Sequence, residues 1–125
     1  MRFARVSLWL AALAFAGFGA ALLARPSLLG VLGVALARPA AATEIRAFYG
    51  GLELGMAAFL GFASRRDAWV RPALAAQAAT LGGVALARAI GMAVDGSAEP
   101  LILAFGAVEA AGALLAVAAL RRLRG

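Results

Sequence analysis

The chain consists of long apolar runs separated by short segments that hold most of its charges. Four runs, residues 6–24, 45–64, 72–94 and 99–120, are long enough to cross a bilayer, since about 20 helical residues span a hydrocarbon core of roughly 30 Å. They are rich in Ala and Leu and lack the period-two alternation of strands. A helix also satisfies every backbone hydrogen bond within its own segment, as lipid requires. The pattern therefore predicts an all-α membrane protein, a four transmembrane helix bundle forming one domain over residues 1–125.

A shorter apolar run, residues 27–37, lies between the first two predicted spans and is bracketed by Pro26 and Pro39. As a helix it would reach only about 16 Å, roughly half a bilayer. Its leucines fall on one helical face. We interpret this run as a short interfacial or re-entrant helix. A fifth span is the alternative, which Arg38 and Pro39 disfavour by interrupting the run.

Residues with known positional preferences predict where the helices begin and end. Thr43 is expected to cap the second spanning helix, with Glu44 in its first turn. Pro72 is expected to start the third, because proline suits the first helical turn. The tripeptide Asp95–Ser97 predicts a tight turn, followed by Pro100 in the first turn of the fourth helix.

The arginines outside the spans or at their ends predict the orientation of the chain. Three of them, Arg25, Arg38 and Arg46, lie near the connection between the first two spans. The larger group comprises Arg2, Arg5, Arg65, Arg66, Arg71, Arg121, Arg122 and Arg124. Because basic residues are enriched in cytoplasmic segments, this group and both termini are expected in the cytoplasm. Trp9 and Trp69 fall near the same predicted interface, as aromatic anchors do.

The first apolar run also has an alternative reading as a signal peptide, with Met1–Arg5 as its basic segment. The run is longer than the usual 7 to 15 residues or so, and Arg25–Pro26 follows in place of a small-residue cleavage site. We therefore expect a retained helix.

Composition narrows the class further. With 65% hydrophobic and 14% charged residues, the chain has too little polar surface to cover a water-soluble domain. It has no Cys and no His, which removes thiol chemistry and the commonest metal ligands, so no metal site is expected. All twelve basic residues are Arg, and the net charge is +6. This charge is interpreted as topology and contact with lipid headgroups; nucleic acid is not an expected partner.

Three charged residues, Glu53, Arg88 and Glu109, lie inside the predicted spans. Such charges cost roughly 2.5 to 3.5 kcal/mol each on insertion scales, so they usually pair or mark a functional site. Counted at the rise of a helix, both glutamates lie about 13 Å below the outer end of their spans and Arg88 about 9 Å. One guanidinium could therefore face two carboxylates, and we predict a single network.

Helical spacing extends this candidate site. Arg46, Tyr49 and Glu53 share a face of the second span, and Arg88 and Asp95 share a face of the third. The whole candidate set is Arg46, Tyr49, Glu53, Arg88, Asp95 and Glu109. These groups either fix the helix register or bind a ligand, and the sequence leaves both readings open.

Two classes of function fit these residues. In the first, the protein binds a small amphiphile such as a lipid or quinone, or serves as a membrane accessory subunit. In the second, Glu53 and Glu109 carry protons in a small transporter or an intramembrane acid–base enzyme. No catalytic residue or cofactor is assigned. The sequence also leaves open whether several copies of the chain assemble into a homo-oligomer.

Three stretches carry a resemblance to a known family. They are Glu44–Gly55 (EIRAFYGGLELG), Ala87–Gly91 (ARAIG) with Asp95-Gly96, and a glutamate in the last span. Together they resemble the bacterial membrane family called domain of unknown function 4345. The resemblance covers most of the chain and departs at Ala87, where glycine is expected. It implies a four-helix integral protein of the bacterial cytoplasmic (inner) membrane, and it implies no activity.

Overall fold

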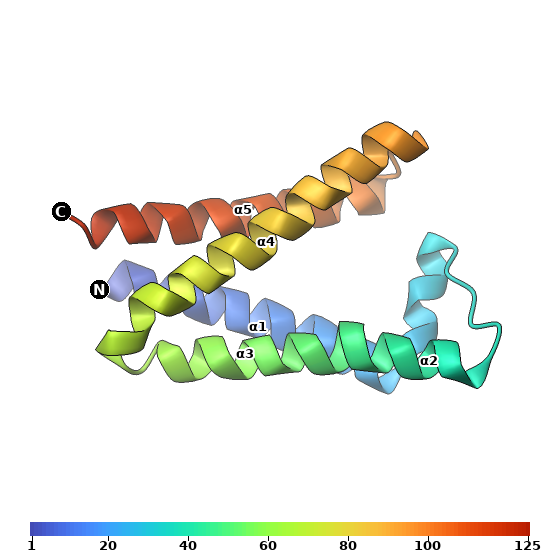
Figure 1. Cartoon of the computed structure of the whole chain (residues 1–125), viewed down its shortest axis with the longest axis horizontal. Helices are drawn as coiled ribbons and strands as arrows, with labels where there is room; N and C mark the ends of the chain where they lie inside the picture. Colours follow the sequence, from blue (N-terminus) through green and yellow to red (C-terminus); the bar gives the residue numbers. More distant parts are fainter. The chain divides into compact units, whose positions relative to one another are not determined.

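The structure, a computed structural model, describes residues 1–125, and its regular secondary structure is entirely helical, which confirms the all-α class. The α-helices are α1 (Arg2–Ala24), α2 (Pro39–Ile45), α3 (Leu52–Ala63), α4 (Asp67–Asp95) and α5 (Pro100–Arg122) (Figure 1). A 3-10 helix, η1 (Pro26–Leu32), follows α1, and a π-helical segment, η2 (Arg46–Gly51), joins α2 to α3. Three of the helices, α1, α4 and α5, are long and apolar enough to cross a membrane.

The second predicted span is helical but not one regular α-helix. Helical backbone runs through α2, η2 and α3 without a break, from Pro39 to Ala63. It begins six residues before the predicted start, with Pro39 at the first helical position, where its missing N–H is not needed. Thr43 therefore lies inside the helix instead of capping it, and its hydroxyl donates to the carbonyl oxygen of Pro39 at 3.3 Å. Whether this stretch spans a membrane stays a prediction.

The segment predicted as a helix over residues 27–37 is helical only in its first part. The 3-10 helix η1 ends at Gly33, whose φ of +81° places it in the left-handed region that glycine adopts without strain. The N–H of Gly33 donates to the carbonyl oxygen of Gly30 at 2.9 Å and closes the last turn. Residues 34–37 are not helical, so the predicted helix is wrong there. Its interfacial or re-entrant placement stays a prediction.

The end of α4 and the start of α5 lie where the sequence predicted a turn. The start of α4 differs from the prediction. Helix α4 begins at Asp67, so Pro72 lies within the helix and not at its start. An acidic residue in the first turn favours this earlier start, because it interacts well with the N-terminal end of the helix dipole. At the other end, Gly96 has a φ of +66° and terminates α4. Pro100 occupies the first turn of α5, as predicted.

The chain forms two compact units, and helix α1 contributes to both. The first unit, here called the hairpin unit, comprises Met1–Trp9 and Ala63–Gly125. Within it α4 packs against α5, and the unit contains the buried residues Val70, Leu74 and Ala116. The single domain predicted over the whole chain stays a prediction.

The second unit, Leu10–Phe62, is here called the π unit because it contains η2. A Cβ atom on Gly19 of α1 would lie 2.9 Å from the carbonyl oxygen of Gly50 and 3.1 Å from Cβ of Glu53. A Cβ atom on Gly50 would in turn lie 3.0 Å from Cα of Leu23. The two glycines therefore allow α1 to contact the backbone of η2 and α3 directly, as small residues do in membrane helix packing.

Candidate functional site

The hairpin unit brings together two of the charged residues predicted to interact, Arg88 on α4 and Glu109 on α5. Nε of Arg88 donates to Oε2 of Glu109 at 2.8 Å, and Nη2 donates to Oε1 at 2.6 Å. The side chains are 23% and 16% exposed, respectively. A bidentate guanidinium–carboxylate pair of this kind is strong and directional, and it neutralises two charges that would each be costly in hydrocarbon.

Residues one turn before Glu109 on α5 shape the space around this pair. The ring of Phe105 lies 5.5 Å from Cζ of Arg88, within the range of a cation–π contact. A Cβ atom on Gly106 would lie 3.4 Å from Cδ of Arg88, so the glycine leaves room for the stem of the arginine. Spacings of three and four residues put Phe105, Gly106 and Glu109 on one helical face. That face holds the guanidinium in a fixed position.

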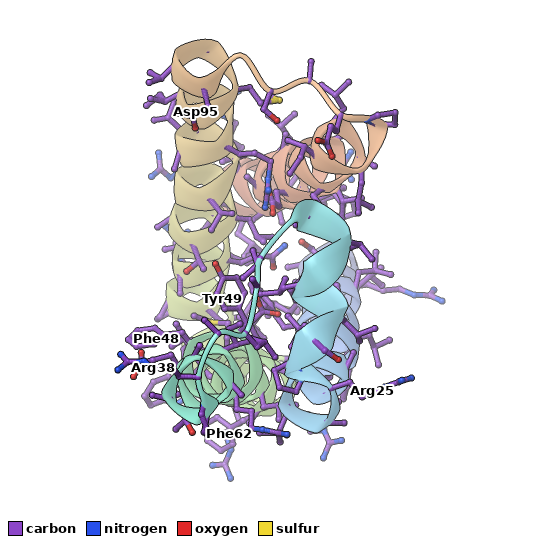
Figure 2. All side chains as sticks on the ribbon, turned by 90° about the vertical axis from the view of Figure 1, so that its right-hand side faces the viewer. Arg25, Arg38, Phe48, Tyr49, Phe62 and Asp95 are labelled. Carbon is purple, nitrogen blue, oxygen red and sulfur yellow. The ribbon has the colours of Figure 1, made fainter.

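An open pocket of about 170 Å³ lies beside Arg88 at the end of the α4–α5 hairpin. It is lined by Arg88, Gly91, Met92, Asp95, Ser97 and Ile102. Asp95 stands at the end of α4, next to the link to α5 (Figure 2). A Cβ atom on Gly91 would lie 3.7 Å from Oδ2 of Asp95, so the carboxylate extends back along the helix over the glycine. Arg88 and Asp95 thus both line this pocket, as their shared helical face suggested.

Arg46 bonds to the end of a helix in the π unit, and its predicted part in a ligand site stays a prediction. Its Nη1 donates to the carbonyl oxygen of Leu23 and, at 3.4 Å, to that of Ala24. These carbonyls belong to the last turn of α1, where a helix has no partners of its own for them. Arg46 therefore caps the C-terminus of α1.

Of the residues predicted to share a helical face with Arg46, some pack against α1 and one is exposed. Gly50 and Glu53 pack against α1, as the close approach at Gly19 shows. Tyr49 is 46% exposed, next to the 63% exposed Phe48 (Figure 2). Glu53 belongs to the π unit, and Arg88 and Glu109 belong to the hairpin unit. The predicted network of three charges therefore stays a prediction for Glu53.

A buried polar cluster lies in the hairpin unit, around Gln77. Gln77 is 1% exposed, and its Nε2 donates to Oγ of Ser7 at 3.1 Å and to the carbonyl oxygen of Gly112 at 3.0 Å. The signal available in the sequence was weak: a single Ser and a single Gln within two apolar runs. Their amide and hydroxyl groups satisfy one another, so the cluster is a structural one.

The comparison with family models gives one match. The model of the domain of unknown function DUF4345 matches residues 3–120. The chain belongs to this family. The comparison with curated proteins and the comparison with solved structures found no match. Membership of DUF4345 confirms the resemblance stated above, and it assigns no activity, so the function of this DUF4345 protein has to be argued from its own residues.

Proposed function

We propose that this DUF4345 protein is a four-span protein of the bacterial inner membrane that binds the polar head of an amphiphile at the end of the α4–α5 hairpin. Three helices that are long and apolar enough support the membrane assignment, and the unbroken helical stretch from Pro39 to Ala63 is the proposed fourth span. The distribution of arginines supports cytoplasmic termini. On this topology the α4–α5 link lies on the outer side of the membrane.

The observation that carries the proposal is the partly exposed Arg88–Glu109 pair at the edge of a pocket in an apolar helical hairpin. At the rise of a helix, Arg88 lies about 10 Å below the end of α4, in the outer half of the hydrocarbon core on this topology. The pocket presents a guanidinium from Arg88, a carboxylate from Asp95 and a hydroxyl from Ser97. These groups can hold both a hydrogen-bond acceptor and a hydrogen-bond donor of a polar head.

The size of the pocket indicates that only a head enters it. Pockets that enclose a whole drug-sized ligand measure about 300 to 1,000 Å³, and this one measures about 170 Å³. Elsewhere on the two helices, large apolar side chains are exposed, with Ile90 56% exposed, Val94 78% exposed and Leu103 50% exposed. An apolar tail would therefore lie in the surrounding bilayer, against the apolar surface of the hairpin, while its head occupies the pocket.

The test is mass spectrometry of the lipids and other amphiphiles that remain bound after mild detergent extraction. We expect a specific amphiphile with the unchanged protein and its loss from the double variant R88L/E109L, in which two well-packed leucines replace the pair at little cost in stability. The variant D95N/S97A alters the pocket without touching the pair and should also lose the ligand. The matched control is E99Q, since Glu99 lies in the same link outside the pocket lining.

The outcomes separate cleanly. Retention of the same amphiphile, in the same amount, by both R88L/E109L and D95N/S97A would refute binding at this site. Loss from both, with retention by E99Q and unchanged thermal unfolding, would support it. If R88L/E109L fails to fold, D95N/S97A alone decides, because both of its residues lie at the exposed end of the hairpin.

A further inference from the structure

Three segments of the hairpin unit meet at one end: the start of α1, the link between α3 and α4, and the end of α5 (Figure 1). We call this the arginine end, because it carries eight of the twelve arginines of the chain. They are Arg2, Arg5, Arg65, Arg66, Arg71, Arg121, Arg122 and Arg124. The acidic side chain among these segments is Asp67. One carboxylate can neutralise one of eight guanidinium groups, so this end holds a large excess of positive charge.

Contacts made by the arginines themselves hold the three segments together. Nη2 of Arg5, on α1, lies 2.5 Å from Oδ1 of Asp67, at the start of α4. Nη1 of Arg71, on α4, donates to the carbonyl oxygen of Leu123, just after α5, at 3.5 Å. The fold thus brings basic residues from three separate segments of the chain together at this end.

Two further arginines at this end lie on aromatic rings. Cζ of Arg122 lies 4.3 Å from the ring centroid of Phe3, and Cζ of Arg65 lies 5.4 Å from that of Trp9. A cation–π contact fixes the plane of a guanidinium but does not neutralise its charge. Donors of both arginines are therefore held in place with their positive charge intact.

Three arginines, Arg2, Arg121 and Arg124, are exposed and form no ion pair in the structure. Guanidinium groups bind phosphate oxygens with paired hydrogen bonds, so a phosphate is the anion that fits them best. Trp9 and Trp69 are 39% and 46% exposed at the same end, as amphipathic rings are at the level of lipid headgroups. The phosphate is therefore expected from a lipid.

We infer that the arginine end binds anionic phospholipid headgroups, through Arg2, Arg121 and Arg124 together with the arginines held on Phe3 and Trp9. This surface is distinct from the pocket at the other end of the α4–α5 hairpin, and its occupant is a lipid of the bilayer rather than a selected ligand. Each arginine near an anionic surface contributes about a fivefold gain in affinity.

The experiment measures binding of phosphatidylglycerol to the whole protein in neutral detergent micelles, by native mass spectrometry and by the thermal midpoint. We expect phosphatidylglycerol to bind and to raise the midpoint, while phosphatidylcholine at the same mole fraction does not. The triple variant R2Q/R121Q/R124Q should bind phosphatidylglycerol roughly 100-fold more weakly. The matched control is R25Q/R38Q, which removes two exposed arginines of the π unit and should change the affinity less than twofold.

The same measurement with soluble glycerol phosphate tests whether the bound phosphate belongs to a lipid or to a free small molecule. Equal stabilisation by glycerol phosphate would assign the surface to free phosphates and overturn the lipid assignment. Equal binding of phosphatidylcholine, or an unchanged affinity in the triple variant, would overturn the inference as a whole. The proposed amphiphile site is read out separately, because R2Q/R121Q/R124Q leaves Arg88, Asp95 and Ser97 unchanged.

Discussion

Replacing Gly19 by alanine should disrupt the closest backbone approach in the π unit. The added Cβ would lie 2.9 Å from the carbonyl oxygen of Gly50, and 3.1 Å both from the backbone nitrogen of Leu54 and from Cβ of Glu53. Two of these atoms belong to helical backbone, so they cannot rotate away as the end of a side chain can. Overpacking of this kind typically costs about 1 to 3 kcal/mol. Alanine is also a better helix former than glycine by about 0.5 to 1 kcal/mol, which offsets part of the cost.

A matched control removes this second effect. Gly17 lies two residues earlier on the same helix, and a Cβ there would meet nothing within 4 Å. G17A and G19A gain the same helix propensity, so the difference between their unfolding free energies isolates the steric cost. We expect G19A to be less stable than G17A by about 1 to 3 kcal/mol in mixed-micelle unfolding followed by tryptophan fluorescence. Equal stability of the two variants would refute the close approach of α1 to η2 and α3.

Three further predictions concern other contacts. G112A should cost less stability than G19A, because its Cβ would meet Cδ1 of Leu81, the end of a flexible side chain, at 2.5 Å. Adding L81A should recover part of the lost stability in the same unfolding assay. No recovery would contradict this contact as the cause of the loss. Q77L should cost about 1 to 3 kcal/mol, since it leaves buried hydrogen-bonding partners unsatisfied, and an unchanged unfolding midpoint would count against it. R46Q should speed hydrogen exchange in the last turn of α1 while R25Q does not, and equal exchange in both would exclude the cap.

The helices could be predicted from the sequence because apolar runs bounded by charges determine which segments can be buried in lipid. Their first turns could not, because a helix can extend past the apolar run into the interface, where hydropathy gives no signal. This is why α4 begins at Asp67 although Pro72 marks the start of the apolar run. The π-helical segment Arg46–Gly51 also escaped prediction, since a wider backbone turn leaves no trace in the order of apolar and polar residues.

Interactions in the candidate site could be predicted from the sequence only where both interacting groups are side chains. Matching depths of Arg88 and Glu109 on two spans suggested an interaction, and the structure places them in a bidentate pair. The partners of Arg46 are two backbone carbonyls at the end of α1, and a backbone acceptor has no sequence signature. Spacing alone therefore could not indicate this contact of Arg46, and its predicted part in a ligand site stays a prediction.

This difference in partners decides which arginine the backbone itself requires. The carbonyls at the end of α1 need hydrogen-bond donors if they lie away from water, so Arg46 is required by the backbone whether or not a ligand exists. Arg88 lies within α4, where the backbone groups are satisfied by the helix itself. Two apolar side chains in place of Arg88 and Glu109 would pack there at similar stability. On this argument the hairpin can fold without the pair, and under our proposal the pair serves the opening at its edge, which Asp95 and Ser97 also line.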